Sequence, residues 1–199
     1  MRIKHKHMKK IVFSALLVRL SIALCGCSMY FLQNNKKRYL SMSGEQLASL
    51  SDTELYEAIM YRTEHIVDAV LMAGGEWEDG VNAMNPSQKL VYSLNWLELE
   101  IQNGGIVQFF SNSSRMTAPF VSEYLSLVGA YEHQKLYDDF IVNNGIDLND
   151  LSPFDIDDLS EFAALYEKYP SDAFDDAWYT LDSIEIYLVQ YIREHLADF

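Results

Sequence analysis

Apolar residues recur at helical spacing over most of the chain beyond residue 50. The clearest case lies after residue 85, where Leu90, Leu94, Leu97 and Ile101 follow one another at intervals of four, three and four residues. These intervals place all four side chains on one face of an α-helix. The alternation of period two that is typical of a strand does not occur over any useful length. The pattern predicts an all-α fold, a single compact multi-helix domain.

Both ends of this helix are also indicated. Asn85 is a residue type that caps helices, and the ring of Pro86 fixes a φ that suits the first turn. Gly104 and Gly105 indicate the end, because glycine adopts the left-handed conformation of a C-terminal cap without a steric penalty. We therefore expect Gly104 to have a positive φ.

The segment after the two glycines is too apolar for a surface loop. It contains Ile106, Val107, Phe109 and Phe110, and it is followed by the polar run at residues 112–114. Asn and Ser side chains cap and turn the backbone. We expect a short buried aromatic turn, and then a polar turn that leads to the next helix.

The same criteria predict helices elsewhere. Ser51 and Glu54 form a capping box that opens a helix ending near Met72, and residues 75–85, which include Trp77, are expected to be a loop. Further helices are expected at about 119–128, with Phe120, Tyr124, Leu127 and Val128 facing inward, and at 131–144, 159–169 and 171–195.

Charge is distributed unevenly along the chain. Residues 1–38 contain nine Lys or Arg and no acid, whereas residues 39–199 contain six Lys or Arg and all 29 acids, a net charge of −23. This sign argues against direct binding of nucleic acid. It favours a basic protein as partner, with small cations or no partner as the alternatives.

The first 26 residues are typical of a bacterial lipoprotein signal peptide. A basic start precedes a mostly apolar run from Ile11 to Cys25, and Leu24-Cys25-Gly26-Cys27 is similar to the box at which such signals are cleaved before a lipid-modified cysteine. We expect a signal peptide at 1–26, lipidation of Cys27, a linker at 27–44 and an acidic helical domain at 45–199. The acyl chains would hold the protein at a membrane surface of the bacterial cell envelope.

Because of Arg19, two alternatives to the predicted lipoprotein signal stay open. This arginine lies inside the apolar run, where a charge costs about 2.5–3.5 kcal/mol on insertion scales. The run is also shorter than the roughly twenty apolar residues that span a membrane. An uncleaved anchor and a cytoplasmic protein with an unusual start therefore stay open. The chain has only two cysteines, Cys25 and Cys27, too few for a disulfide framework or a zinc cluster.

Two blocks of sequence stand out. The first, EIQNGGIVQFFSNSS at residues 100–114, has as its characteristic positions Glu100, Asn103, Gly104, Gly105, Gln108, Phe109, Phe110, Asn112, Ser113 and Ser114. The second comprises Phe174, Asp175, Asp176, Tyr179, Tyr191, Ile192 and Arg193. Together they resemble a bacterial family of acidic helical proteins named after a DNA mimic protein, over roughly residues 50–196. Arg115 stands where the family pattern has a glycine, so the end of that turn is expected to differ.

The resemblance implies a structural role for the motif and a non-catalytic module whose negative face occupies a basic protein surface. The acids that could build such a face are Asp172, Asp175, Asp176, Asp182 and Glu185, with Glu161 and Glu167 on the preceding helix. The alternative is an ordinary solvated face, in which acids near helix N-termini stabilise the helix dipole.

No pattern indicates a cofactor, a metal ion or a catalytic centre. The acidic run at 147–158 lacks the glycine that a calcium-binding EF-hand loop needs at its sixth position. His65 and His133 lack a second imidazole one helical turn away. The hydroxyls of residues 111, 113 and 114 have no neighbouring base or oxyanion loop, so we interpret them as capping groups. We expect a protein that is not an enzyme.

Two functions of different classes follow. The first is the acidic binding module; the second is a membrane-anchored envelope lipoprotein whose acidity only serves solubility. Location separates them, because a DNA mimic has little to compete with outside the cytoplasm. The sequence does not indicate the oligomeric state.

The lipoprotein signal gives the first testable prediction. Cys27→Ser should abolish incorporation of labelled palmitate and leave an uncleaved precursor, because the thiol of Cys27 is the acylated group. Metabolic labelling and mass spectrometry measure both. Wild-type protein that stays soluble and still begins at Met1 or Met8 would contradict the prediction.

Overall fold

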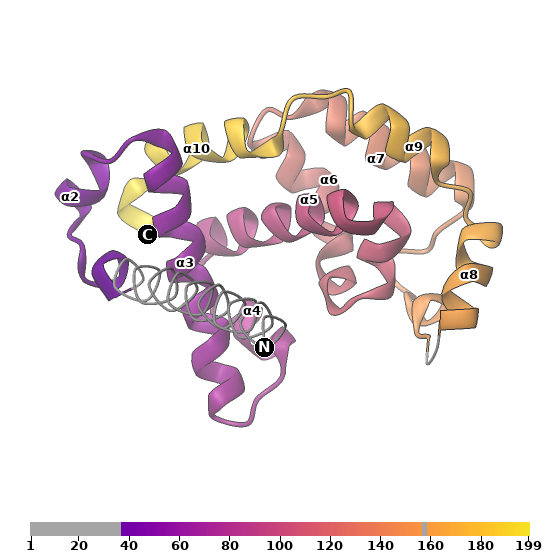
Figure 1. Ribbon diagram of the computed structural model, residues 1–199, viewed down its shortest axis with the longest axis horizontal. Helices are drawn as coiled ribbons and strands as arrows, with labels where there is room; N and C mark the ends of the chain where they lie inside the picture. The colour runs from indigo at the N-terminus through magenta and orange to yellow at the C-terminus, as the bar shows by residue number, and fades with distance from the viewer. Residues whose placement is uncertain (1–36, 157–158) are drawn as a thin grey trace, which may run out of the picture. The chain divides into compact units, whose positions relative to one another are not determined.

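A computed structural model describes residues 37–156 and 159–199 (Figure 1). The chain divides into two units, Met1–Met42 and Ser43–Phe199. The predicted signal peptide, Cys27 and most of the predicted linker lie outside the described residues. Within the predicted linker, residues 37–41 are helical.

The second unit consists of helices joined by short connections. In chain order they are α2 (Gly44–Ala48), α3 (Asp52–Met72), α4 (Trp77–Asn82), α5 (Pro86–Ser111), η1 (Ser113–Thr117), α6 (Ala118–Leu127), α7 (Tyr131–Asn144), η2 (Ser152–Phe154), α8 (Leu159–Lys168), α9 (Asp172–Trp178), α10 (Ile184–Glu194) and η3 (Leu196–Asp198). The described residues contain no strand, which confirms the all-α prediction. None of their helices is long and apolar enough to cross a membrane.

Helix α5 is the centre of this unit. It contacts α3, α6, α8, α9 and α10 (Figure 1). Its stripe of Leu90, Leu94, Leu97 and Ile101 is fully buried, as the spacing predicts. Asn85 caps it by accepting the backbone N–H of Gln88 at 2.9 Å.

The two glycines bend α5 and do not end it. Gly104 has an extended φ of −164°, whereas Gly105 has φ 78° and ψ 176°, so the prediction of a positive φ at Gly104 is wrong by one residue. The helix resumes at Ile106 and runs to Ser111, which makes the predicted aromatic turn a second helical segment. Phe109 and Phe110 are fully buried there, as predicted.

Several other boundaries follow the sequence. Ser51 and Glu54 form the predicted capping box of α3. Gly145, in the left-handed conformation, ends α7. By contrast, α4 occupies the predicted loop, where Trp77 packs against a small apolar cluster of Val67, Val81, Met84 and Tyr92.

The inward face predicted for α6 is wrong. Ala118, Val121 and Leu125 are buried, while Phe120 and Leu127 are 40% and 58% exposed. Because η1 leads directly into α6, the helix begins at Ala118, one residue before the predicted start.

The single helix predicted at 171–195 is two helices, α9 and α10. The break has a physical cause on α5. Glu98 accepts the hydroxyl of Ser183 at 2.9 Å and the backbone N–H of Ile184 at 2.8 Å, and it thereby holds a new helix start at this point.

The conformation of Gly105 gives a stability prediction. An added Cβ would lie 2.5 Å from Oδ2 of Asp175, and the φ/ψ of Gly105 belongs to a region that is essentially restricted to glycine. Gly105→Ala should therefore lower the free energy of unfolding by at least about 1–3 kcal/mol in urea titrations.

Gly129→Ala is the matched control, since Gly129 also has a positive φ, 82°, but a Cβ there would meet no atom within 4 Å. It should cost less. Equal losses at the two positions would show that the contact with Asp175 does not matter.

Candidate functional site

The kink leaves carbonyl groups of α5 without their helical partners, and two tyrosines satisfy them. The hydroxyl of Tyr179 donates to the carbonyl of Ile101 at 2.6 Å, and the hydroxyl of Tyr166 donates to the carbonyl of Gly104. These tyrosines lie at the end of α9 and on α8. Two later elements therefore complete the hydrogen bonding of the first half of α5.

Asp175 accepts a hydrogen bond from the helical segment that follows the kink. Its carboxylate accepts the backbone N–H of Ile106 at 2.8 Å and the hydroxyl of Ser171 at 2.8 Å. Burial raises the pKa of Asp175, the two donated hydrogen bonds lower it, and the charges of Asp172 and Asp176 raise it further. Asp175, predicted as part of an acidic binding face, is half-buried, and its carboxylate is bonded to the backbone of α5.

Glu100 joins the motif residues that follow the kink. It is 7% exposed. One carboxylate oxygen accepts the side-chain amides of Gln108 at 2.7 Å and Asn112 at 2.8 Å, and the other accepts the hydroxyl of Ser114 at 3.4 Å. The motif therefore reads as one hydrogen-bonded cluster around a buried carboxylate.

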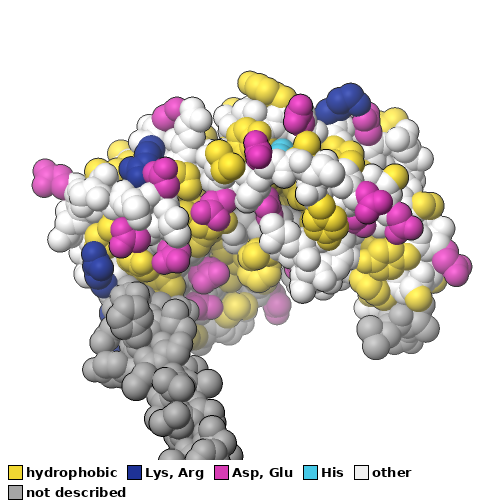
Figure 2. All heavy atoms as spheres, turned by 45° about the horizontal axis from the view of Figure 1, so that its top comes forward, with side chains coloured by type: hydrophobic (Ala, Val, Ile, Leu, Met, Phe, Trp, Pro, Cys, Tyr) yellow, Lys and Arg dark blue, Asp and Glu magenta, His cyan; other side chains and the backbone are white. Residues whose placement is uncertain are grey.

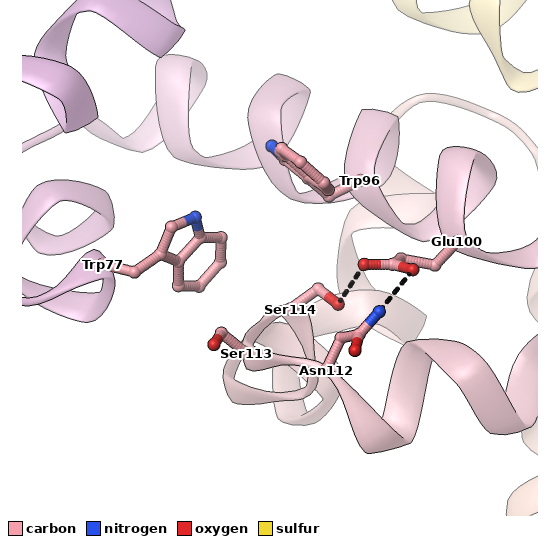
Figure 3. Close-up of a pocket in the computed structure, with 6 residues that line it drawn as sticks. All are labelled: Trp77, Trp96, Glu100, Asn112, Ser113 and Ser114. Atoms are coloured by element: carbon pink, nitrogen blue, oxygen red, sulfur yellow. Dashed lines mark hydrogen bonds between the residues drawn. The ribbon is translucent and has the colours of Figure 1, made fainter. Parts of the chain in front are cut away.

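This cluster forms one side of a pocket of about 250 Å³. The residues that line the pocket are Trp77, Trp96, Glu100, Asn112, Ser113 and Ser114 (Figure 3). Trp77 comes from α4, Trp96 and Glu100 lie one turn apart on α5, and the last three residues follow the end of α5. Asn112 and Ser113 are exposed and form its rim, whereas Glu100 and Ser114 are buried.

The other predicted surface acids lie in separate surroundings. Asp172 and Asp176 are exposed beside Asp175. Asp182 lies near His133. Glu185 lies near Glu98, whose pKa is raised first by burial. Asp172, Asp175 and Asp176 therefore lie together on α9, and the common face predicted for all five acids stays a prediction.

A family model described as DMP19-like protein matches residues 82–195. The chain belongs to this family. The match covers α5 with its kink, the Glu100 cluster, and α8 to α10, but not Trp77. Searches of curated proteins and of solved structures give no match.

The three histidines among the described residues, His65, His133 and His195, are packed against aromatic rings. His133 is 1% exposed, and Trp178 and Tyr187 meet it edge-on at 4.8 and 5.7 Å. Burial lowers its pKa, and its Nδ1 has no hydrogen-bond partner among the described residues. His65 and His195 stack on tyrosines. No three His, Cys, Asp or Glu of the described part are placed to hold a metal ion.

The acidic loop before α8 is held by local turns. Asp147 accepts the backbone N–H of Asn149 at 2.9 Å, and Asp150 accepts that of Ser152 at 3.1 Å. These are Asx turns, which place carboxylates on the backbone and not around a common centre.

Side chains after the kink bond backbone carbonyls near the end of α5, among them the hydroxyl of Ser114, which donates to the carbonyl of Phe109 at 3.3 Å. The hydroxyl of Ser111 donates back to the carbonyl of Val107 at 2.8 Å. Arg115 donates to the carbonyls of Ser111 and Asn112 at 3.3 Å and pairs with Asp155. An arginine thus supplies, from its side chain, the cap that a glycine conformation supplies elsewhere.

Sequence reasoning missed the two indoles, Glu98 and Tyr166. Trp96 and Glu100 are four residues apart on a predicted helix, and this spacing indicates that they lie on one face. Trp77 could not be placed beside them, because its segment was predicted to be a loop. Asn103, by contrast, is an exposed motif residue whose place nothing in the structure explains.

The Glu100 cluster gives a prediction about stability. Glu100→Leu should lower the free energy of unfolding by about 1–3 kcal/mol, because the amides of Gln108 and Asn112 lose their acceptor. Glu100→Gln should cost much less, since one amide oxygen can still accept from both. Denaturant unfolding measures both variants.

Glu78→Leu is the control, because Glu78 is exposed on α4, and it should change stability by no more than about 0.5 kcal/mol. If Glu100→Leu were as mild as this control, the cluster would not hold the motif together.

Proposed function

We propose that this DMP19-like protein is a non-catalytic acidic binding module whose negative surface occupies a basic surface of another protein. One observation carries the proposal: residues 39–199 contain 29 acids against six bases, on a folded helical unit. The family supports a DNA-mimic-like role in general terms, and the basic partner is the finer part of the proposal.

The bases of this unit are engaged with their own surroundings. Arg115, Lys135 and Arg193 form ion pairs with Asp155, Asp139 and Asp52. Lys89 donates to Asn82 at 2.8 Å and lies over the ring of Phe120, and Lys168 lies over the ring of Tyr169. The face drawn in Figure 2 accordingly shows many Asp and Glu side chains and few Lys or Arg. The excess acids are left to interact with a partner or with solvent.

Two exposed carboxylates suit a test of this surface. Asp172 and Asp176 lie on α9, and neither makes a hydrogen bond or ion pair within the described part of the chain. Asp175 between them is unsuitable, because reversing its charge would disturb the kink of α5. Lipidation of Cys27, which stays a proposal, would hold the protein at a membrane surface and favours the alternative function, the envelope lipoprotein.

The decisive experiment is calorimetry with a basic protein that co-purifies from the source cells. Affinity should fall as salt rises, and duplex DNA should compete, because both contend for one basic surface. Replacing Asp172 and Asp176 together by Lys should weaken binding by about tenfold or more.

The matched control is Glu45→Lys with Glu78→Lys, which makes the same change in net charge on α2 and α4. It should weaken binding less. A protein with no basic partner, or with binding that ignores salt, would instead favour an envelope lipoprotein whose acidity serves solubility.

A further inference from the structure

The pocket beside the Glu100 cluster combines a buried acid with aromatic walls. Glu100 is only 7% exposed, yet it lines the pocket. In the described part of the chain Glu100 makes no ion pair, and its hydrogen-bond partners are the neutral groups of Gln108, Asn112 and Ser114. A buried carboxylate is normally paired with a cation, so the charge of Glu100 lacks its usual partner.

The two indoles are fixed as walls. Tyr92 lies between them, with ring centroids 5.9 Å from Trp77 and 6.1 Å from Trp96. Burial raises the pKa of Tyr92, and the two neighbouring indoles lower it. The Trp96 N–H nevertheless makes no well-formed hydrogen bond. Figure 3 shows the flat face of Trp96 turned toward the space between Trp77 and Ser114.

An aromatic face attracts a cation, and the attraction adds to that of a nearby carboxylate. The charges of Glu64 and Asp68 on α3 also raise the pKa of Tyr92, so the surroundings of these rings carry further negative charge. The volume of about 250 Å³ is smaller than that of a drug-sized ligand site and suits one side-chain head group. A guanidinium fits this chemistry better than an ammonium, because it is planar, stacks on rings and is more weakly hydrated.

We propose that this pocket binds an alkylguanidinium group, as carried by arginine, with the cation against the face of Trp96 and beside the carboxylate of Glu100. If the group belongs to a basic partner, the pocket anchors one arginine of the surface that the acidic module occupies; only this last step rests on the proposed function.

The test is a titration of isotope-labelled full-length protein with propylguanidinium, followed by NMR. The indole N–H signals of Trp77 and Trp96 should shift and saturate, while that of Trp178, which does not line the pocket, should stay unchanged. Propylurea has the same shape without the charge and should bind at least about tenfold more weakly, a difference of about 1.4 kcal/mol. Equal binding of the two compounds, or no saturable shift, would overturn the proposal.

Two variants keep the test independent of folding. Glu100→Gln removes the charge but can retain the amide hydrogen bonds, and it should lower the affinity for propylguanidinium by about tenfold. Ser113→Trp places a ring at the exposed rim and should block the pocket without touching the core. Thr53→Trp is its control on the exposed start of α3 and should leave binding unchanged. Binding that survives both pocket variants would contradict the assignment.

A further arm identifies the source of the guanidinium. Capped arginine, with neutral amides at both ends, should bind at least as tightly as free arginine if the pocket receives a side chain of a protein; tighter binding of free arginine would indicate the amino acid itself. These titrations need no partner protein. The proposal for the pocket can therefore be contradicted while the salt-dependent binding of a basic protein is confirmed, or the reverse.

Discussion

The fold depends on how the bend in α5 is satisfied. A helix that changes direction at its middle leaves carbonyl and N–H groups without their helical partners, and other groups must satisfy them. Here Tyr166, Tyr179 and Asp175 satisfy them from α8 and α9. The bend thus fixes where the C-terminal helices dock, and the absent side chain of Gly105 makes room for Asp175.

Two carboxylates on the first half of α5 have different structural roles. Glu98 starts α10 by accepting from Ser183 and Ile184, and Glu100 gathers the polar side chains beyond the bend. Both are substantially buried in a protein whose other acids are mostly solvated. The acids of the chain therefore fall into two groups. A few hold the helices together, and the many others are exposed at the surface.

Much of the fold could be predicted from local rules. The apolar stripe of α5, the cap at Asn85, the capping box of Ser51 and the left-handed Gly145 each depend on residues close in sequence. What could not be predicted depends on distant partners. Whether Gly104 or Gly105 carries the positive φ is decided by Asp175, about seventy residues later, and the break before α10 is decided by Glu98. The pocket could not be predicted either, because Trp77 and Glu100 line it together through the packing of α4 on α3, which links residues distant in sequence.

The position of Asp175 couples the surface of the domain to its interior. Asp172 and Asp176 raise the pKa of Asp175, so their negative charge weakens the ionised state that binds the N–H of Ile106. A positive group of a partner beside those exposed acids would relieve this repulsion, and by thermodynamic linkage the kinked form of α5 would in turn favour the bound partner. Binding of a partner at this surface would then stabilise the bend in the central helix. The unit would open to proteases less often with the partner bound than without it.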